Sequence, residues 1–325
     1  MTLLTRASPQ TLRLMALGLA LLATVLFFAT QIEGYLSPRM FTRISTSAAV
    51  VLPIAVGQAI VIMTRNIDLS AGSIMGVVAY MAGQTLSAMP DLHPALAVLL
   101  CMAIGAGFGA INGLLIAWGR VPSIIVTLGT LALFRSFLVE WSDAKTITTA
   151  SLPQWLVDLP SANAFSIGGL DIRVTVVLAL AAVLVTGLAL TFYRPARRFY
   201  AVGSNPDAAV MAGINARRVV LSAFIISGAF AGLSGFLFLA KFGNITVVAG
   251  LGFELKAIAA VVVGGVSIMG GSGSMIGVLM GALLVDTIDN SLTRWAVVSE
   301  FWRDALLGGL IMAAVTLDTL ASRQL

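Results

Sequence analysis

The stretch from residue 59 to residue 76 reads AIVIMTRNIDLSAGSIMG, and residues 260–277 read AVVVGGVSIMGGSGSMIG. In each, an apolar segment is followed by an interruption rich in small or polar residues, and then by another apolar segment. A shift of 201 residues brings identical residues into register: Ala59 with Ala260, Ile67 with Ile268, Gly72 with Gly273, Ser73 with Ser274, and Gly76 with Gly277. The pattern predicts an internal repeat. Chance similarity stays an alternative, because small residues are common in such chains.

The composition places the whole chain among membrane proteins. Of its 325 residues, 59% are hydrophobic and 10% are charged, whereas soluble domains carry about 25% charged residues. The mean hydropathy is +1.01, and an apolar excess of this size must face lipid. The net charge of +5 indicates arginines at the cytoplasmic membrane face rather than a nucleic-acid partner. The one cysteine, Cys101, supports neither a disulfide framework nor a metal cluster.

Ten segments are long and apolar enough to span a bilayer as helices. They are residues 14–31, 44–64, 70–89, 95–118, 122–140, 173–192, 219–240, 254–269, 273–292 and 303–320. The first follows Arg6 and Arg13, but it lacks a clear cleavage site and more spans follow, so we interpret it as a retained helix. The predicted fold is an all-α polytopic membrane protein, one transmembrane domain over residues 1–325. Its interrupted segments, spans 2–3 and 8–9, form the pseudo-repeat.

The loop at residues 193–218 orients the chain. It holds one acid, Asp207, against five arginines: Arg194, Arg197, Arg198, Arg217 and Arg218. Such a loop is cytoplasmic, and counting outward from it puts both termini in the cytoplasm. The segment 141–172 then forms a loop on the outer side, which is periplasmic if the membrane is a bacterial inner membrane. Arg39 and Arg43 also fall outside, against the general trend.

Paired interruptions in the two halves of a transporter point to its translocation pathway. Asp68 lies in the first, either as a buried functional carboxylate or as a simple cap at the cytoplasmic surface beside Arg65. Ser70 is expected to cap the next helix. Glu254, which opens the eighth span with Lys256, either lines the outer mouth or complements the helix dipole. The candidate pathway residues are Asp68, Ser70, Gly72, Asn112, Thr127, Glu254, Gly271 and Gly273; the polar residues of spans four and five could instead bond between helices.

Residues 206–212, in the central loop, are predicted to form a short helix between two loops. Asn205 suits the N-cap, and Pro206 suits the first helical position. Asp207 suits the first turn, and Gly213 suits the C-cap. A short helix with small side chains at the cytoplasmic face fits a groove in another protein. The alternative is an ordinary connector at the membrane interface.

Enzyme chemistry has little support in the sequence. No Gly-x4-Gly-Lys-[Ser/Thr] motif occurs, and the glycine-rich run at residues 270–274 lacks the lysine of a phosphate-binding loop. No His-Glu-x2-His, cysteine pair or Gly-x-Ser-x-Gly motif occurs either. Any nucleotide hydrolysis through a P-loop therefore belongs to another chain.

Three motifs resemble those of the permease subunits of bacterial monosaccharide ABC importers, in the branched-chain amino acid and sugar permease superfamily. They are residues 66–74 (NIDLSAGSI), residues 200–205 (YAVGSN) with Ala208, Ala209, Gly213 and Ile214, and residues 254–260 (ELKAIAA) with the glycine pairs that follow. The match covers nearly the whole chain in order and departs at Asn66, where glycine is usual. Residues 121–130 and 300–304 look most like the subgroup for rhamnose or autoinducer-type sugars.

The resemblance implies a set of partners. Two permease chains, as a homodimer or a paralogue pair, bind two ATPase subunits in the cytoplasm, and a periplasmic or lipid-anchored sugar-binding protein docks outside the bacterial inner membrane. ATP and Mg²⁺ belong to the ATPase, and this chain has no cofactor, catalytic site or metal site of its own. The implied ATPase-coupling residues are Gly203, Asn205, Asp207, Ala208, Ala209, Gly213 and Ile214. A competing hypothesis is an ion-coupled secondary transporter that uses Asp68 and Glu254 and does not need the helix at 206–212.

Overall fold

A computed structural model describes residues 9–295 and a few isolated positions between 302 and 316. The long helices are α1 (Pro9–Gln31), α2 (Pro38–Met63), α3 (Ala71–Ala88), α4 (Pro94–Ala117), α5 (Ser123–Ser142), α7 (Val174–Phe192), α10 (Ala216–Phe242) and α12 (Met275–Trp295). Within the described residues, all of these except α3 are long and apolar enough to cross a membrane. The predicted all-α polytopic membrane fold is therefore confirmed.

The predicted count of ten spans is not confirmed. The eighth prediction, 254–269, is wrong in extent, because α11 (Phe253–Val263) has only 11 residues. At 1.5 Å per residue it is about 16 Å long, against a hydrocarbon core of about 30 Å. The helix ends because Gly264 closes it and Gly265 takes a φ of 82°. The tenth prediction, 303–320, lies outside the described residues apart from the isolated positions.

Both halves of the predicted repeat have the helix–interruption–helix form, as α2–α3 and α11–α12. Their first helices also end alike. Arg65 (φ 64°) and Gly265 (φ 82°) are both left-handed, and in each case the amide of the next residue bonds back across five positions. However, α3 begins at Ala71 and α12 begins only at Met275. The second interruption is longer than the first. A uniform shift of 201 residues therefore superposes neither the ends of the first helices, α2 and α11, nor the starts of the second helices, α3 and α12.

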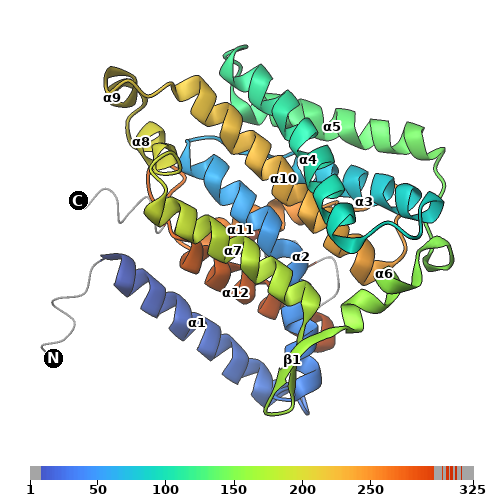
Figure 1. Cartoon of the computed structure of the whole chain (residues 1–325). Helices are drawn as coiled ribbons and strands as arrows, with labels where there is room; N and C mark the ends of the chain where they lie inside the picture. Colours follow the sequence, from blue (N-terminus) through green and yellow to red (C-terminus); the bar gives the residue numbers. More distant parts are fainter. Residues whose placement is uncertain are drawn as a thin grey trace, which may run out of the picture.

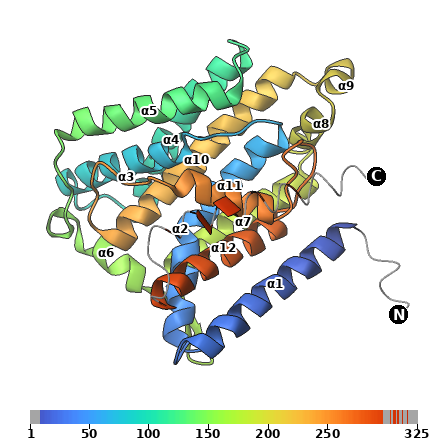
Figure 2. The ribbon, with the colours of Figure 1, turned by 180° about the vertical axis from the view of Figure 1, so that it is seen from behind.

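The core lies around α2 and α10, which other helices enclose, while α1 lies at the periphery beside α12 (Figure 1, Figure 2). Helices α4 and α10 approach closely through glycines. A Cβ on Gly105 would lie 2.2 Å from the carbonyl oxygen of Gly228, and one on Gly109 would lie 2.2 Å from that of Phe224. Glycines four positions apart thus let the two backbones touch.

Short elements lie at the two ends of the bundle. A two-stranded antiparallel hairpin, β1 (Asn163–Ile167) and β2 (Leu170–Arg173), leads directly into α7, which ends shortly before α8 (Arg198–Ser204) and α9 (Pro206–Met211). The hairpin and α9 therefore mark opposite ends, here called the hairpin end and the α9 end (Figure 1). Before the hairpin come η2 (Thr149–Ser151), α6 (Gln154–Asp158) and η3 (Leu159–Ser161).

The short helix predicted at residues 206–212 is confirmed as α9. The prediction of a loop before it is wrong, because α8 extends to Ser204 and only Asn205 separates the two helices. Asn205 ends one helix and caps the next because its backbone is extended, with φ −155° and ψ 102°.

Candidate functional site

Asp68, in the interruption between α2 and α3, lies at the centre of a buried polar network. Its side chain is 0% exposed. One carboxylate oxygen accepts from the Ser70 amide at 3.0 Å and hydroxyl at 2.7 Å, and the other accepts from the Ser227 hydroxyl of α10 at 3.3 Å. With its amide nitrogen turned toward the Asp68 backbone, the Gln58 side chain donates to the Asp68 carbonyl at 3.1 Å. Its side-chain oxygen then accepts from the Asp68 backbone amide at 3.2 Å. The protein thus supplies the hydrogen bonds that a buried carboxylate needs.

This geometry excludes the surface position considered for Asp68, and a functional role for its carboxylate stays a prediction. A surface cap beside Arg65 is wrong, because the carboxylate is fully buried and the Arg65 guanidinium bonds to α8. The predicted side-chain cap by Ser70 is also wrong, since its hydroxyl donates to Asp68 and accepts from the Asn112 amide at 2.7 Å. Thr127 of α5 donates to the carbonyl of the residue before Asp68 at 3.3 Å. Asn112 and Thr127 therefore bond between elements, one of the two roles considered for them.

Glu254 lies at the start of α11, against the first turn of α3. Its Oε1 accepts from the Gly252 amide at 3.2 Å, and its Oε2 is buried without a hydrogen-bond partner in the described part of the chain. A Cβ on Gly72 would lie 2.0 Å from this Oε2. Arg135 of α5 holds the loop before α11 by donating to two of its carbonyls, at 3.0 and 2.6 Å. The carboxylate of Glu254 thus occupies the space that a side chain at position 72 would need.

A charged cluster that the sequence reasoning missed lies between α11 and α12. The Lys256 ammonium donates to Asp289 and lies 3.6 Å from Asp286 Oδ1, which also accepts from the Ser47 hydroxyl of α2 at 3.1 Å. Asp286 is 0% exposed, and its Oδ2 has no hydrogen-bond partner among the residues that are described. The available signal was two acids at i and i+3 on one face of an apolar helix, because ionisable groups are rare in spans.

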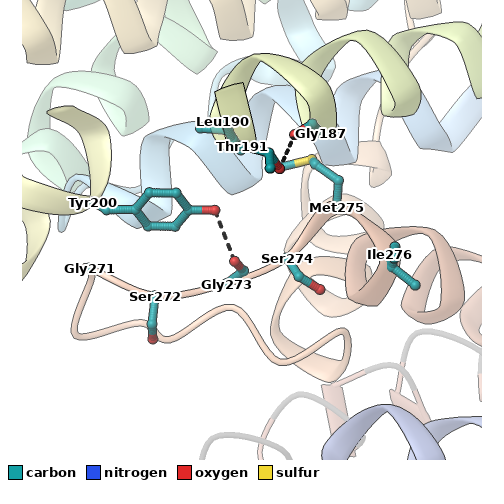
Figure 3. Close-up of a pocket in the computed structure, with 10 residues that line it drawn as sticks. All are labelled: Gly187, Leu190, Thr191, Tyr200, Gly271, Ser272, Gly273, Ser274, Met275 and Ile276. Carbon is teal, nitrogen blue, oxygen red and sulfur yellow. Dashed lines mark hydrogen bonds between the residues drawn. The ribbon is translucent and has the colours of Figure 1, made fainter. Parts of the chain in front are cut away.

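At the α9 end, the second interruption meets both α2 and α8. The Gly271 amide donates to the Met63 carbonyl at the end of α2, at 3.0 Å. The Tyr200 hydroxyl of α8 donates to the Gly273 carbonyl, also at 3.0 Å (Figure 3). Burial raises the pKa of the Tyr200 phenol, which keeps it a neutral donor. A cavity of about 400 Å³ opens beside this contact, lined by the end of α7, Tyr200 and residues 271–276 (Figure 3).

Both ends of α9 are capped as the sequence predicts. The Asn205 side chain accepts from the Ala208 amide at 3.0 Å. α9 ends at Met211, and the left-handed Gly213, with φ 78°, lets the Ile214 amide bond back to the Ala209 carbonyl at 2.9 Å. This is the bond of a glycine-terminated helix, in which a left-handed residue lets the last carbonyls be satisfied.

The surface of α9 is more apolar than its alanines indicate. Val210 is 59% exposed and Met211 is 90% exposed. Of the implied coupling residues, Asn205, Asp207, Ala208 and Gly213 are exposed, Ile214 is half-buried, and Gly203 and Ala209 are buried. Only part of that set can therefore touch another protein, and Gly203 and Ala209 face the interior of the bundle.

Comparison with known proteins places this bundle in a family. The profile of the family described as branched-chain amino acid transport system / permease component matches residues 40–315. The chain belongs to this permease family. The autoinducer 2 import system permease protein LsrC of Escherichia coli O9:H4 (strain HS) is 36% identical over 302 residues, 92% of this chain and 85% of the relative.

Proteins of the same name in other bacteria are similarly related to this permease. Those of Yersinia enterocolitica serotype O:8 and Salmonella typhi are each 36% identical, over 304 and 300 residues. These matches cover 93% and 92% of this chain, and 82% and 84% of the relatives. No solved structure matches the permease.

The eight predicted pathway residues fall into three places in this permease. The network around the first interruption contains Asp68, Ser70, Asn112 and Thr127. Gly72 and Glu254 lie against each other where α3 and α11 begin. Gly271 and Gly273 line the cavity at the α9 end. Their assignment to a solute pathway stays a prediction.

Proposed function

We propose that this permease is the membrane subunit of an ATP-binding cassette importer that moves a small sugar-like solute, of the monosaccharide or autoinducer-2 type, into the cell. The observation that carries the proposal is α9, an exposed helix that is capped at both ends and carries the exposed Met211. A short helix of this kind suits a groove on an ATPase subunit. The 36% identity to permeases named for autoinducer 2 import supports the solute class.

The proposed orientation puts the α9 end and both termini in the cytoplasm and the hairpin end outside a bacterial inner membrane. The five arginines of residues 193–218 support it, because positive charge stays on the cytoplasmic side. ATP and Mg²⁺ bind the ATPase subunit only. A sugar-binding protein docks at the hairpin end, and a second permease, identical or paralogous, completes the pore.

In this proposal, closure of the ATPase pair displaces α9 and switches the bundle from outward-open to inward-open. The cavity beside Tyr200, with the hydroxyls of Ser272 and Ser274 in its lining, is the proposed inner exit for a polyhydroxylated solute. The network around Asp68 holds the first interruption in shape, since each of its hydrogen bonds joins that segment to itself or to an enclosing helix.

The competing function is an ion-coupled secondary transporter. One observation favours it: the buried Oε2 of Glu254 lacks a hydrogen-bond partner among the described residues, and a carboxylate in that state is a candidate proton or cation site. This function provides no role for the exposed apolar surface of α9, which is why we rank it second.

Reconstitution in vesicles, with the ATPase and binding protein of the same transport system, separates the two functions. We expect uptake of labelled autoinducer-2, rhamnose or ribose that requires ATP and persists in the Glu254→Gln variant. Uptake driven by an ion gradient without ATP, and lost in Glu254→Gln, would contradict the proposal.

A pull-down of the ATPase tests the role assigned to α9. Met211→Asp puts a charge on the exposed apolar surface and should abolish co-purification. Ile167→Asp is the matched control, because Ile167 is 66% exposed but lies in β1 at the hairpin end. Equal co-purification of both variants would count against α9 as the contact.

A further inference from the structure

Arg65, in the first interruption, holds the end of α8. Its Nε donates to the Gly203 carbonyl at 2.5 Å, and its Nη2 donates to the Ser204 carbonyl at 2.6 Å. These carbonyls belong to the last turn of α8, where no later residue of the helix can bond to them. A guanidinium supplies both donors from one rigid plane, which a lysine ammonium cannot do. The left-handed φ of 64° at Arg65 belongs to the turn that follows α2, and this turn brings Arg65 to the end of α8.

Backbone contacts join the same point to the end of α2 and to the second interruption. A Cβ on Gly203 would lie 1.7 Å from the Met63 carbonyl oxygen and 2.6 Å from the Gly271 amide nitrogen. A Cβ on Gly271 would lie 2.7 Å from the Ser204 Cα. Three segments that are distant in sequence therefore meet with no side chain between them, and no sliding is possible without breaking the hydrogen bonds that cross the junction.

The hydroxyl of Tyr200 makes the second polar link from α8. It donates to the Gly273 carbonyl at 3.0 Å, near the end of the second interruption (Figure 3). Tyr200 and the Arg65-bound carbonyls lie in the same seven-residue helix, so one short element is tied to both interruptions.

Helix α9 follows α8 after a linker of one residue. Asn205 is the only residue between α8 and α9, and its side chain caps α9. Ala209 is buried against the bundle, and the bond from Ile214 back to Ala209 closes the other end. A displacement of α9 must therefore displace α8.

We infer that Arg65 and Tyr200 are positioning residues of a coupling junction, through which movement of α9 reaches both interruptions at once. Arg65 links α8 to the first interruption, and Tyr200 links α8 to the second. The inference rests on the proposed function and deepens it, because it names the residues that transmit the movement. It also gives a mechanical role to Arg65, a non-glycine residue with a left-handed backbone in the first interruption.

The test measures ATP hydrolysed per solute imported by the reconstituted complex of permease, ATPase and binding protein. Arg65→Gln removes the charged fork but leaves the exposed surface of α9 intact. We expect it to bind the ATPase normally while the ATP-to-solute ratio rises at least about tenfold, the effect of losing two charge-assisted hydrogen bonds. Arg65→Lys, which keeps the charge but places all its donors on one nitrogen, should recover part of the coupling. Tyr200→Phe should raise the ratio by about two- to fivefold, because it loses one neutral bond.

Two matched controls accompany these variants. Arg120→Gln removes an exposed arginine, also at a left-handed residue, from the turn between α4 and α5, and Tyr193→Phe removes the hydroxyl of a tyrosine that is 62% exposed. Both should keep the native ratio. The inference is overturned if Arg65→Gln imports with a ratio within about twofold of native, or if it loses the ATPase, which would make Arg65 a support of the docking surface. If the native complex shows no ATP-dependent import, the proposed function fails, and the inference fails with it.

Discussion

Replacing Lys256 by methionine tests whether the carboxylates of Asp286 and Asp289 depend on the Lys256 ammonium for the stability of the fold. The Lys256 side chain is 15% exposed, that of Asp286 is 0% exposed and that of Asp289 is 18% exposed. Methionine keeps an unbranched apolar chain of similar length but removes the ammonium. The two carboxylates then lose their common cation inside the bundle, one turn apart on the same helix.

Removing one partner of a buried ion pair costs about 3–5 kcal/mol, because a charge is left without compensation. We therefore expect Lys256→Met to lower the free energy of unfolding by about 3–5 kcal/mol. Lys145→Met is the matched control, because its ion pair with Asp143 is exposed, with side chains 75% and 81% accessible. Exposed pairs contribute at most about 1 kcal/mol. Adding Asp286→Asn and Asp289→Asn to Lys256→Met should restore most of the lost stability, since the two carboxylates that Lys256 compensates are then neutral.

Unfolding by titration with SDS in detergent micelles, followed through the fluorescence of the five tryptophans, measures these free energies. Refolding on dilution checks that the transition is reversible. The reasoning is refuted if Lys256→Met unfolds within about 1 kcal/mol of native, or if the triple variant is less stable than the single one.

Three further substitutions address the other sites. Gly72→Ala should destabilise the protein by about 1–3 kcal/mol, because its Cβ would meet Glu254 Oε2 at 2.0 Å and the Gly250 carbonyl at 2.6 Å. Gly129→Ala is the control, because a Cβ on Gly129 would have nothing within 4 Å, and it should unfold like native in the same SDS titration. Asn205→Ala should destabilise α9 by about 1 kcal/mol and speed amide hydrogen exchange in that helix, because it removes the N-cap. Asn205→Asp, which keeps a capping oxygen, should keep native protection from exchange. Equal exchange in the two variants would refute the cap. Asp68→Asn should lower the free energy of unfolding by about 1–3 kcal/mol, because three hydrogen bonds converge on the carboxylate, without changing the order of preference in a panel of labelled sugars. A changed order of preference would place Asp68 in contact with the solute.

The elements of this permease that local sequence predicts best are those that local hydrogen bonds build. The start of α9 follows from Asn205 and Pro206, and its end follows from Gly213. Most of the long helices follow from apolar runs of sufficient length, since a helix satisfies its own backbone in lipid. The same reasoning failed at α11, where a run of the right composition contains Gly264 and Gly265 and the helix stops after 11 residues.

The candidate sites depended on partners that no local pattern identifies. Asp68 is satisfied by Ser227, 159 residues away, and Arg65 bonds to Gly203, 138 residues away. The cluster of Lys256 with Asp286 and Asp289 joins two helices across a long interruption. A sequence shows that such residues are polar and lie among apolar ones, but burial and pairing are properties of the packed bundle.

The sequence by itself therefore determined the membrane class, most of the helices, the two interrupted segments and the capped helix α9. Each of these depends on interactions between residues within about five positions, or on composition summed over about 20 residues. Only the tertiary structure decided that the two interruptions meet α8 at one junction, that Asp68 is buried rather than a surface cap, and that Glu254 fills the space beside Gly72. The physical reason is that contacts at these distances depend on how closely whole helices approach, and that approach is set by small residues acting together on several helices.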